Sequence, residues 1–422
     1  MSSQEKAETM LGPYRVLDLT DEKGLYCGQL LGSLGADVIK IEKPGGDRAR
    51  NIGPFYHDIP DPEKSLFWFA FNANKRGITL NIETADGKEI FKRLVKTADV
   101  VVESSSPGYM DKLGLGYSEL EKLNPGLIMT SITPFGQDGP YRDYKASDLI
   151  CWAMGGLLFQ TGEPERPPVH TSHIPLAYLL GSMDGAWATV VALYWKGTSG
   201  RGQQVDVSIE QSVVKTSYLP HEFWEATGVE SPRASTFYRV ANSDVQLKSV
   251  WPAKDGHIAF LIFGGHWGAT HDNPPMVQWM DEEGMADDFI KQVDWANLNW
   301  RRTPPDEVER IHSYFGRFFK TKTKAELHKE ALKRRLSIQP ICTLTDILEH
   351  PQFKARNYWQ RLEHPELDTT ISYPGRSCLP SETPCKLWRR APLIGEHNQE
   401  IYQEELGLSK EAVVALKQAG II

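Results

Sequence analysis

The chain has 422 residues and a net charge of −8, with 40% hydrophobic and 24% charged residues. This is the composition of an ordinary globular protein, and the length exceeds what one compact core usually holds, so we expect two domains. No basic stripe is visible, which argues against nucleic acid as a partner.

Neither the N-terminus nor the apolar runs indicate a membrane protein. Residues 1–11 are polar and mixed in charge, without the apolar core of a signal peptide. No uninterrupted apolar run approaches the ~20 residues that span a bilayer. The five cysteines are odd in number, scattered and without a C-x-x-C pair, which favours neither a disulfide framework nor a zinc knuckle. We therefore expect a cytoplasmic protein with reduced thiols.

The first third of the chain alternates between predicted strands and helices. Runs rich in Val, Ile and Leu predict strands at Tyr14–Leu19, Asp37–Ile41, Ile78–Ile82, Asp99–Glu103 and Leu127–Ile132. Helical spacing predicts helices at Tyr26–Leu34 and Gly87–Ala98. Apolar strands separated by helices imply parallel βαβ units, so we expect a doubly wound α/β sheet covered on both faces.

The rest of the chain divides by composition. The apolar run Leu179–Trp195, interrupted by Asp184, predicts a buried helix, and Gln204–Ile209 predicts a further strand. Aromatic, charged and helical stretches follow. We expect a large domain over residues 1–230, a smaller α+β domain over 231–335, and a return to the large domain over 336–422.

Two histidines and a glycine-rich loop are the first candidates for chemistry. His170 and His173 are three apart, but flanking prolines disfavour a helix and no other ligand stands at a matching offset, so we expect no metal site. The glycines Gly264, Gly265 and Gly268 follow an apolar strand and predict either a tight turn or a flexible flap. No Gly-x-Gly-x-x-Gly or Gly-x-Ser-x-Gly motif supports a nicotinamide dehydrogenase or a serine hydrolase.

Basic residues gather near the predicted strand ends. They are Lys43, Lys75, Arg76, Lys112 and Lys145. Ligands of doubly wound sheets bind beyond the carboxyl ends of the strands, so this cluster could hold phosphates, and an ordinary solvated surface is the alternative. The residues alone thus indicate an α/β protein and leave both interpretations of the basic cluster open.

Several segments together resemble the class III CoA-transferases, the formyl-CoA/carnitine-type or CaiB/BaiF family. In order, they are Leu34–Asp47, Asn72–Leu80, Ala98–Glu103, Pro107–Gly108, Leu113–Tyr117, Phe135–Tyr141, Thr161–Pro164, Gly200–Ser208 and Arg390–His397. The resemblance implies a Rossmann-like large domain, a smaller domain, and two chains linked like interlocked rings. It also implies a coenzyme A thioester as substrate, with no permanently bound cofactor.

The resemblance further implies covalent catalysis by an aspartate. In the family this carboxylate attacks the acyl-CoA, gives a mixed anhydride, and then carries CoA as an aspartyl thioester that the acceptor acid resolves. The family's Val-Pro-Ile-Ala-Asp-Leu is here Ile174–Leu179, which puts Tyr178 at the nucleophile's position. A phenol has no carbonyl carbon and cannot carry an acyl thioester. Asp184 and Asp148 are the nearby carboxylates, and the latter matches a structural position.

We therefore expect no catalytic nucleophile in this chain. The leading hypothesis is the non-catalytic subunit of a heteromeric CoA-transferase, with a homologous partner subunit supplying the aspartate. Heteromeric members such as the succinyl-CoA:(R)-benzylsuccinate CoA-transferases suggest, by analogy, transfer between succinyl-CoA and an aromatic succinate. Family positions that contact CoA keep Lys43, Lys112 and Lys145, whereas serines at 104–106 replace the usual Asn-Phe-Arg.

Two other classes of function stay open. One is a stand-alone acyl-CoA enzyme of the racemase kind, which needs a poised base. His170, His173 and His266 are its candidates. The other is a CoA-binding module that performs no chemistry.

Overall fold

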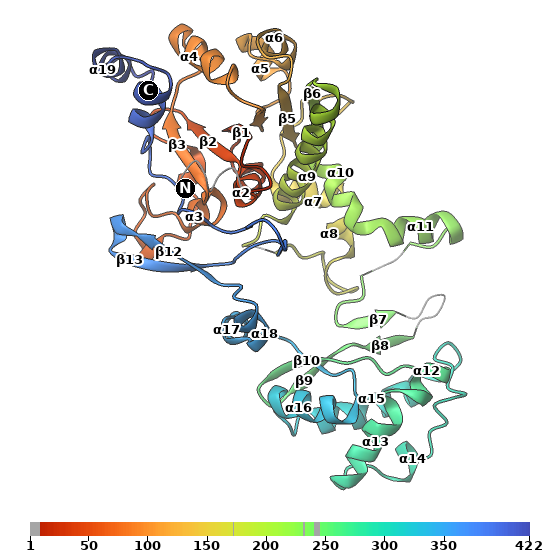
Figure 1. Cartoon of the computed structure of the whole chain (residues 1–422). Helices are drawn as coiled ribbons and strands as arrows, with labels where there is room; N and C mark the ends of the chain where they lie inside the picture. The colour runs from red at the N-terminus through yellow and green to blue at the C-terminus, as the bar shows by residue number, and fades with distance from the viewer. Residues whose placement is uncertain (1–8, 172, 231–232, 240–244) are drawn as a thin grey trace. The chain divides into compact units, whose positions relative to one another are not determined.

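The computed structural model describes residues 9–171, 173–230, 233–239 and 245–422 (Figure 1). The chain divides into two compact units. The first contains Met1–Leu158, His170–Gly228 and Lys354–Ile422, and the second contains Phe159–Val169 and Val229–Phe353. The range expected for the small domain, 231–335, lies inside the second unit. Residues 336–353, expected in the return segment, also belong to the second unit.

A six-stranded parallel sheet forms the centre of the first unit. Its strands are β1 (Arg15–Leu19), β2 (Asp37–Glu42), β3 (Lys75–Thr79), β4 (Val100–Glu103), β5 (Ile128–Thr133) and β6 (Gln203–Ser208). Their order is β3-β2-β1-β4-β5-β6, and every neighbouring pair is parallel. The predicted doubly wound α/β fold is confirmed. This is the Rossmann order, in which ligands bind where the strand order reverses, here between β1 and β4.

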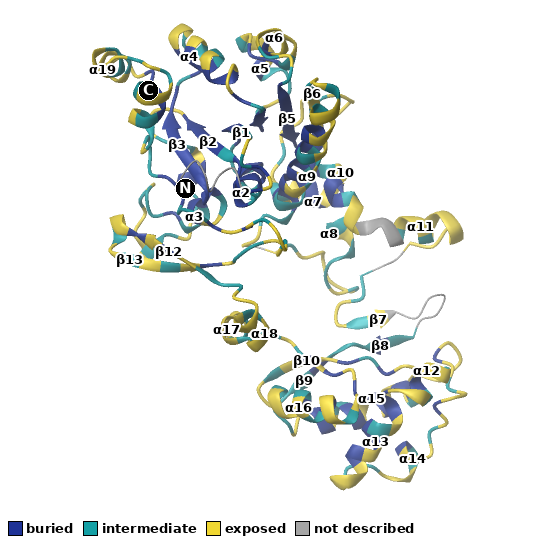
Figure 2. Cartoon of the chain, viewed as in Figure 1, coloured by how far each residue is buried: buried dark blue, intermediate teal, exposed yellow. Residues whose placement is uncertain are grey.

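Alternate residues of the strands face two different cores, because successive side chains in a strand point to opposite faces. On one face, Leu17, Val101 and Met129 pack with helix α4 (Ala85–Val95) and with the C-terminal residues Ile401–Tyr402. On the other, residues such as Val16 pack with α2 (Leu25–Ser33) and α9 (Leu176–Ser199). Figure 2 shows the strands as largely buried.

The strand bounds follow the prediction closely except at β3. The hydrophobic pattern predicted Ile78–Ile82, whereas the strand begins three residues earlier, at Lys75. Lys75 and Arg76 are buried there because carboxylates neutralise both charges, Asp18 for Lys75 and Asp37 for Arg76. A prediction that relies on apolar residues cannot anticipate a strand that opens with two paired cations.

Helix α9 is longer than the predicted Leu179–Trp195, because it begins at Leu176 and ends at Ser199. Among the described residues it is the one helix that could cross a membrane by length and composition alone, and half of its apolar window is buried. Small residues bring it close to its neighbours, among them β5 of the sheet. A Cβ on Gly185 would lie 2.7 Å from Ile132 Cδ1, and one on Gly181 would lie 2.7 Å from Ile209 Cγ1. These contacts are those of a core helix.

Shorter elements complete the first unit. They are α3 (Leu66–Asn72), α5 (Tyr109–Leu113), α6 (Tyr117–Leu123), α7 (Asp148–Met154), α10 (Ile209–Val214), α11 (Tyr218–Thr227), β12 (Gln360–His364), β13 (Thr369–Tyr373), the π-helix η5 (Glu400–Glu405) and α19 (Lys410–Gln418). Helix α8 (Leu157–Gln160) contains the residues at which the chain passes from the first unit to the second. Strands β12 and β13 pair as an antiparallel hairpin.

The second unit has its own sheet and core. The strands are β9 (Val250–Ala253), β10 (Gly256–Ala259) and β11 (Gln339–Pro340), with β7 (Phe237–Arg239) and β8 (Gln246–Lys248) as a separate pair. The helices include α12 (Gly265–Thr270), α13 (Asn273–Glu282), α14 (Asp288–Lys291), α15 (Pro305–Phe319), α16 (Lys324–Arg334) and α17 (Leu344–Glu349). Buried aromatic rings, among them Trp251, Phe260 and Phe315, fill its interior.

Candidate active site

A cleft of about 540 Å³ opens at the carboxyl ends of β1 to β4, where the fold predicts a ligand. Apolar side chains, charged side chains and two serines line it. They are Leu19, Asp21, Ile41, Glu42, Lys43, Gly46, Asp47, Arg48, Leu80, Ile82, Ser105, Ser106, Tyr109 and Met110. A wall of this mixed kind suits an organic anion that carries an apolar group.

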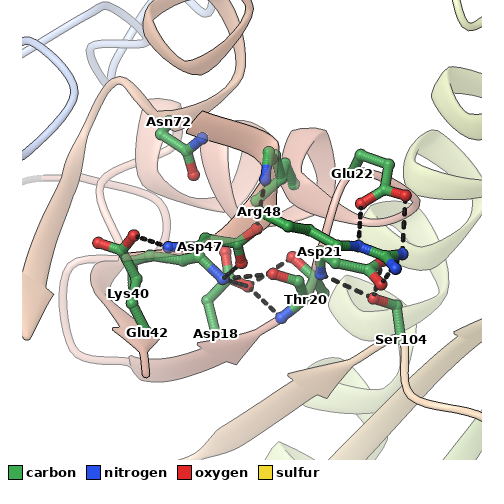
Figure 3. Close-up of polar contacts among 12 residues, drawn as sticks. Asp18, Thr20, Asp21, Glu22, Lys40, Glu42, Asp47, Arg48, Asn72 and Ser104 are labelled. Carbon is green, nitrogen blue, oxygen red and sulfur yellow. Dashed lines mark hydrogen bonds and ion pairs between the residues drawn. The ribbon is translucent and has the colours of Figure 1, made fainter. Parts of the chain in front are cut away.

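An ionic network holds the loop after β1 at the edge of this cleft (Figure 3). The Arg48 guanidinium donates to both Glu22 oxygens, at 2.9 and 2.7 Å, and to Asp21 Oδ2 at 2.7 Å. Ser104, after β4, donates to Asp21 Oδ1 at 2.7 Å. Burial alone would raise the pKa of Asp21, but Lys23, Ser104 and Arg48 outweigh it and hold that pKa below its ordinary value. The network therefore favours the ionised form of Asp21 and joins the ends of β1 and β4.

A second network, in which Asp18, Lys40 and Lys75 are fully buried, lies among the same strands. The Lys75 ammonium is 2.8 Å from Asp18 Oδ2 and also donates to the Leu25 carbonyl and to Asn72 Oδ1. Lys40 donates to the Thr20 carbonyl and is paired with Asp47 at 3.3 Å. Buried charges are tolerated only when they are paired and hydrogen-bonded in this way.

Of the five basic residues predicted to bind phosphate, only Lys43 lines the cleft. Its side chain is 57% exposed and lies 2.9 Å from Glu83 Oε1. Lys112 on α5 and Lys145 before α7 are exposed and do not line the cleft.

The structure does not support Lys75 and Arg76 as phosphate ligands, because both side chains are buried and paired with carboxylates within the chain. Arg76 lies at the amino end of β3 and bonds Asp37 at 2.6 Å, Glu400 at 2.7 Å and Glu405 at 2.5 Å. Sequence reasoning missed Arg48, which lines the cleft with its side chain 65% exposed. Its place shortly after β2, among the carboxyl ends of the strands, was the signal that could have found it.

Tyr178 lies in the first turn of α9 and is only 8% exposed. Its backbone N–H donates to Asp148 Oδ1 at 3.0 Å, and one turn later Ser182 Oγ donates to the Lys23 carbonyl at 3.2 Å. Burial raises the pKa of the Tyr178 phenol far above its ordinary value, and the negative charges of Glu22 and Asp148 among its neighbours add to the rise. The phenol therefore stays protonated beside the loop that borders the cleft.

The two carboxylates considered as replacements for the missing nucleophile, Asp184 and Asp148, are both engaged. Asp184 accepts hydrogen bonds from Ser212 Oγ and Lys215 Nζ, each at 2.6 Å, and from Trp187 Nε1 at 2.8 Å. Burial would raise its pKa, but these donors hold the pKa of Asp184 below its usual value. Asp148 fixes the start of α9 through Tyr178 N–H and bonds His170 Nε2 at 3.0 Å with its other oxygen. Both carboxylates are thus occupied by contacts within the chain.

The three candidate histidines differ in how far they are buried. His170 is half-buried and stacks edge-on against Trp152, with ring centroids 4.8 Å apart, whereas His173 is exposed in a non-helical segment. His266 is exposed on α12. Within the described ranges, no three His, Cys, Asp or Glu side chains are grouped so as to hold a metal ion.

The glycine-rich loop proves to be the start of a short helix. Gly264 precedes α12, and Gly265 opens it with a φ of 70°. Gly268 is required by packing, since a Cβ there would lie 2.0 Å from the Phe263 carbonyl oxygen. The first two glycines line a pocket of about 440 Å³ together with residues 296–301. The expected tight turn or flap is thus a glycine-started helical turn beside a pocket of the second unit.

Comparison with known proteins identifies the family. The sequence profile of CoA-transferase family III matches residues 11–398. The chain belongs to this family. Its recognition as a class III CoA-transferase from sequence motifs is therefore confirmed.

Relatives within the family cover nearly the whole chain. The succinyl-CoA:(R)-benzylsuccinate CoA-transferase subunit BbsE of Thauera aromatica is 34% identical, over 93% of both chains. The succinyl-CoA–L-malate CoA-transferase beta subunit of Chloroflexus aurantiacus is 28% identical, over 94% of both. A crystal structure of a CaiB/BaiF family protein from Brucella suis has a TM-score of 0.77 and 27% identity, covering 94% of this chain and 99% of that one.

Proposed function

We propose that this family III CoA-transferase chain is the subunit that does not form the covalent intermediate. In this proposal a homologous partner subunit supplies the nucleophilic aspartate, and the two chains interlock. Together they move CoA from an acyl-CoA, succinyl-CoA by analogy with the BbsE relative, to a carboxylic acid of the aromatic succinate class.

The observation that carries this proposal is Tyr178. It lies where the family's aspartate is expected, and its buried phenol has no carbonyl carbon to hold CoA as a thioester. Neither Asp148 nor Asp184 replaces it, because each is engaged by at least two donors in the same region. Covalent catalysis needs an available carboxylate at the reacting carbonyl, and the start of α9 offers none.

An exposed apolar face on the first unit supports a partner subunit. Five side chains of α9 are between 49% and 77% exposed, namely Met183, Trp187, Val191, Tyr194 and Trp195. The first three are spaced four residues apart, so they form one stripe along the helix. Apolar surface of this kind is costly in water and marks an interface. The relatives named as subunits, BbsE and the malate CoA-transferase beta subunit, agree with a heteromer.

The residues that line the cleft support the proposal that this chain still binds CoA. Lys43 and Arg48 at its mouth are placed to attract phosphate oxygens, and Leu80, Ile82 and Met110 offer an apolar wall to an adenine ring. For phosphate to bind Arg48, it must compete with Glu22 and Asp21, which already accept from that guanidinium. We therefore expect weak affinity for CoA in this chain alone.

The proposal is tested by purifying the tagged chain from its own host and identifying what accompanies it. We expect a homologous chain that keeps the aspartate, CoA transfer by the complex, and none by this chain alone. A homomer that transfers CoA at the rate of the host's complex would refute the proposal.

One contact favours a second candidate function, proton abstraction from an acyl-CoA. Asp148 orients His170 through a 3.0 Å contact with Nε2, the arrangement by which a carboxylate supports a histidine base. The chain would then catalyse exchange of the α-proton of an acyl-CoA in deuterated water, and His170→Ala would abolish it. Absence of exchange in the unaltered chain would exclude this candidate.

A further inference from the structure

Glu83 joins two side chains that line the cleft of the first unit. Its Oε1 accepts hydrogen bonds from Lys43 Nζ at 2.9 Å and from the Tyr109 hydroxyl at 2.6 Å. Lys43 directly follows β2, and Tyr109 opens α5 after β4, so the two donors come from strands on either side of β1. One carboxylate oxygen thus connects two parts of the cleft wall.

The backbone on both sides of Glu83 is fixed by hydrogen bonds. The Glu83 N–H donates to Asn81 Oδ1 at 3.1 Å, and the Asn81 N–H donates to the Ile421 carbonyl at 2.7 Å. The next residue, Thr84, caps α4, because its hydroxyl accepts from the Gly87 N–H at 3.0 Å. The loop between β3 and α4 therefore holds the Glu83 carboxylate in place beside Lys43.

Lys43 is the cation of the cleft that a ligand can obtain most readily. Among the described residues, Glu83 is the only hydrogen-bond or ion-pair partner of its ammonium group. Arg48, by contrast, donates three hydrogen bonds to Glu22 and Asp21. The side chains of Lys43 and Glu83 are 57% and 45% exposed, and an ion pair this exposed is weak. A phosphate group can therefore displace the Glu83 carboxylate from Lys43.

We propose that Glu83 is an affinity-determining residue of this cleft, which competes with a phosphate group of the ligand for Lys43. This inference rests on the proposed binding of CoA in the cleft. In the free chain, Glu83 holds both Lys43 and Tyr109. In the complex, a CoA phosphate accepts from the Lys43 ammonium, and Glu83 keeps only its bond from Tyr109. The affinity for CoA is lowered in proportion to the fraction of chains in which Glu83 holds Lys43.

The test is a calorimetric titration of the full chain with CoA at one fixed ionic strength. Glu83→Gln removes the competing charge and should tighten CoA binding about two- to fivefold, the range expected from an exposed ion pair. Asp86→Asn is the matched control, because it removes one negative charge from an exposed position in the first turn of α4. It leaves the bonds of Glu83 in place and should change the affinity by less than about 1.5-fold.

A double-variant comparison separates competition for Lys43 from a general effect of charge. In a Lys43→Met background, Glu83→Gln should no longer tighten CoA binding, because the cation for which it competes is gone. Equal tightening with and without Lys43, or no tightening by Glu83→Gln in the wild-type background, would overturn the inference and leave the proposed CoA binding intact. Failure of every protein, the unaltered chain included, to bind CoA would overturn the inference and the retained affinity for CoA together.

Discussion

Tyr178 is surrounded by groups that would make a carboxylate at its position costly. Burial raises its pKa, and Glu22, Asp148 and Asp21 are all negative charges acting on it. An aspartate placed there would be desolvated among like charges, whereas a protonated phenol is neutral. The surroundings of this position thus favour a neutral tyrosine over an ionised aspartate.

The first prediction concerns the Tyr178 hydroxyl. Because the partner subunit performs the covalent chemistry in this account, Tyr178→Phe should leave kcat of the heteromeric complex within about twofold and stability within about 1 kcal/mol. Steady-state CoA transfer and urea unfolding check this. The control is the partner's nucleophilic aspartate changed to asparagine, which should abolish turnover. A tenfold fall in kcat for Tyr178→Phe would show that the phenol takes part in the reaction.

Residue chemistry was only partly predictable. The substitution at 178 followed from a motif, because the spacing to the apolar helix fixes the register. The burial and pairing of Lys75 and Arg76 could not be predicted from the sequence. Their partners Asp18 and Asp37 lie far away in the sequence and meet them only in the folded sheet. Charge alone does not distinguish a phosphate ligand from half of a buried ion pair.

At the scale of elements, the start of α9 depends on one side chain from another helix. Pro175 precedes the helix and supplies no side-chain cap, and Asp148 from α7 accepts the Tyr178 N–H instead. Helix N-termini leave backbone N–H groups unsatisfied, so this carboxylate serves as a cap borrowed from tertiary structure.

The second prediction is the cost of removing this cap. Asp148→Ala leaves the Tyr178 N–H and His170 without their acceptor and should destabilise the first unit by about 1–3 kcal/mol in urea unfolding. Asp143→Ala removes a carboxylate whose side chain is 78% exposed and should change stability by less than about 0.5 kcal/mol. Equal effects of the two variants would contradict the capping role.

The third prediction concerns His312 on α15. Its ring is buried against Trp251, with centroids 5.4 Å apart, and burial together with Lys248 lowers its pKa to about 4. The unfolded chain binds a proton near pH 6.5 and the folded chain does not, so stability is unaffected above that pH and falls as the pH drops toward 4.

Between pH 7.5 and pH 5 this difference amounts to about 2 kcal/mol. Urea unfolding at the two pH values should show the loss in the wild type. His312→Phe keeps an aromatic ring and removes the titration, so its loss over the same interval should be smaller by that amount. The idea fails if both proteins lose stability equally.

Most elements of the first unit were predictable because the spacing of their apolar residues in the sequence is that of a helix or a buried strand. Among the strands of the parallel sheet, all but β3 lie within about one residue of expectation, as does α2. The helical turn at Gly265 was missed because Gly268 is required by packing against the Phe263 carbonyl, which no local pattern encodes.

On the scale of the whole molecule, the C-terminal segment is tied to the N-terminal sheet by contacts far apart in the sequence. Asn74 accepts from the Trp388 N–H at 2.5 Å and donates to the Lys386 carbonyl at 2.9 Å. Arg76 pairs with Glu400 and Glu405 of η5. The return of the chain was predictable from family motifs, whereas these ties required the structure.

The fourth prediction concerns assembly. Val191 on α9 is 54% exposed within the apolar stripe, and Val414 on α19 is 47% exposed elsewhere on the same unit. Val191→Asp places a charge in the proposed interface and should weaken association with the partner by at least tenfold, whereas Val414→Asp should not. Analytical ultracentrifugation of the two variants with the partner checks this. Undiminished association of Val191→Asp would place the interface elsewhere.

The most direct measurement is to trap the covalent intermediate in the heteromeric complex. The complex is incubated with acyl-CoA alone and treated with hydroxylamine, which attacks acyl thioesters and anhydrides, and each chain is then mapped by mass spectrometry. The account predicts a hydroxamate on the partner's aspartate and an unmodified peptide containing Tyr178. A hydroxamate on any carboxylate of this chain, Asp148 or Asp184 included, would contradict it.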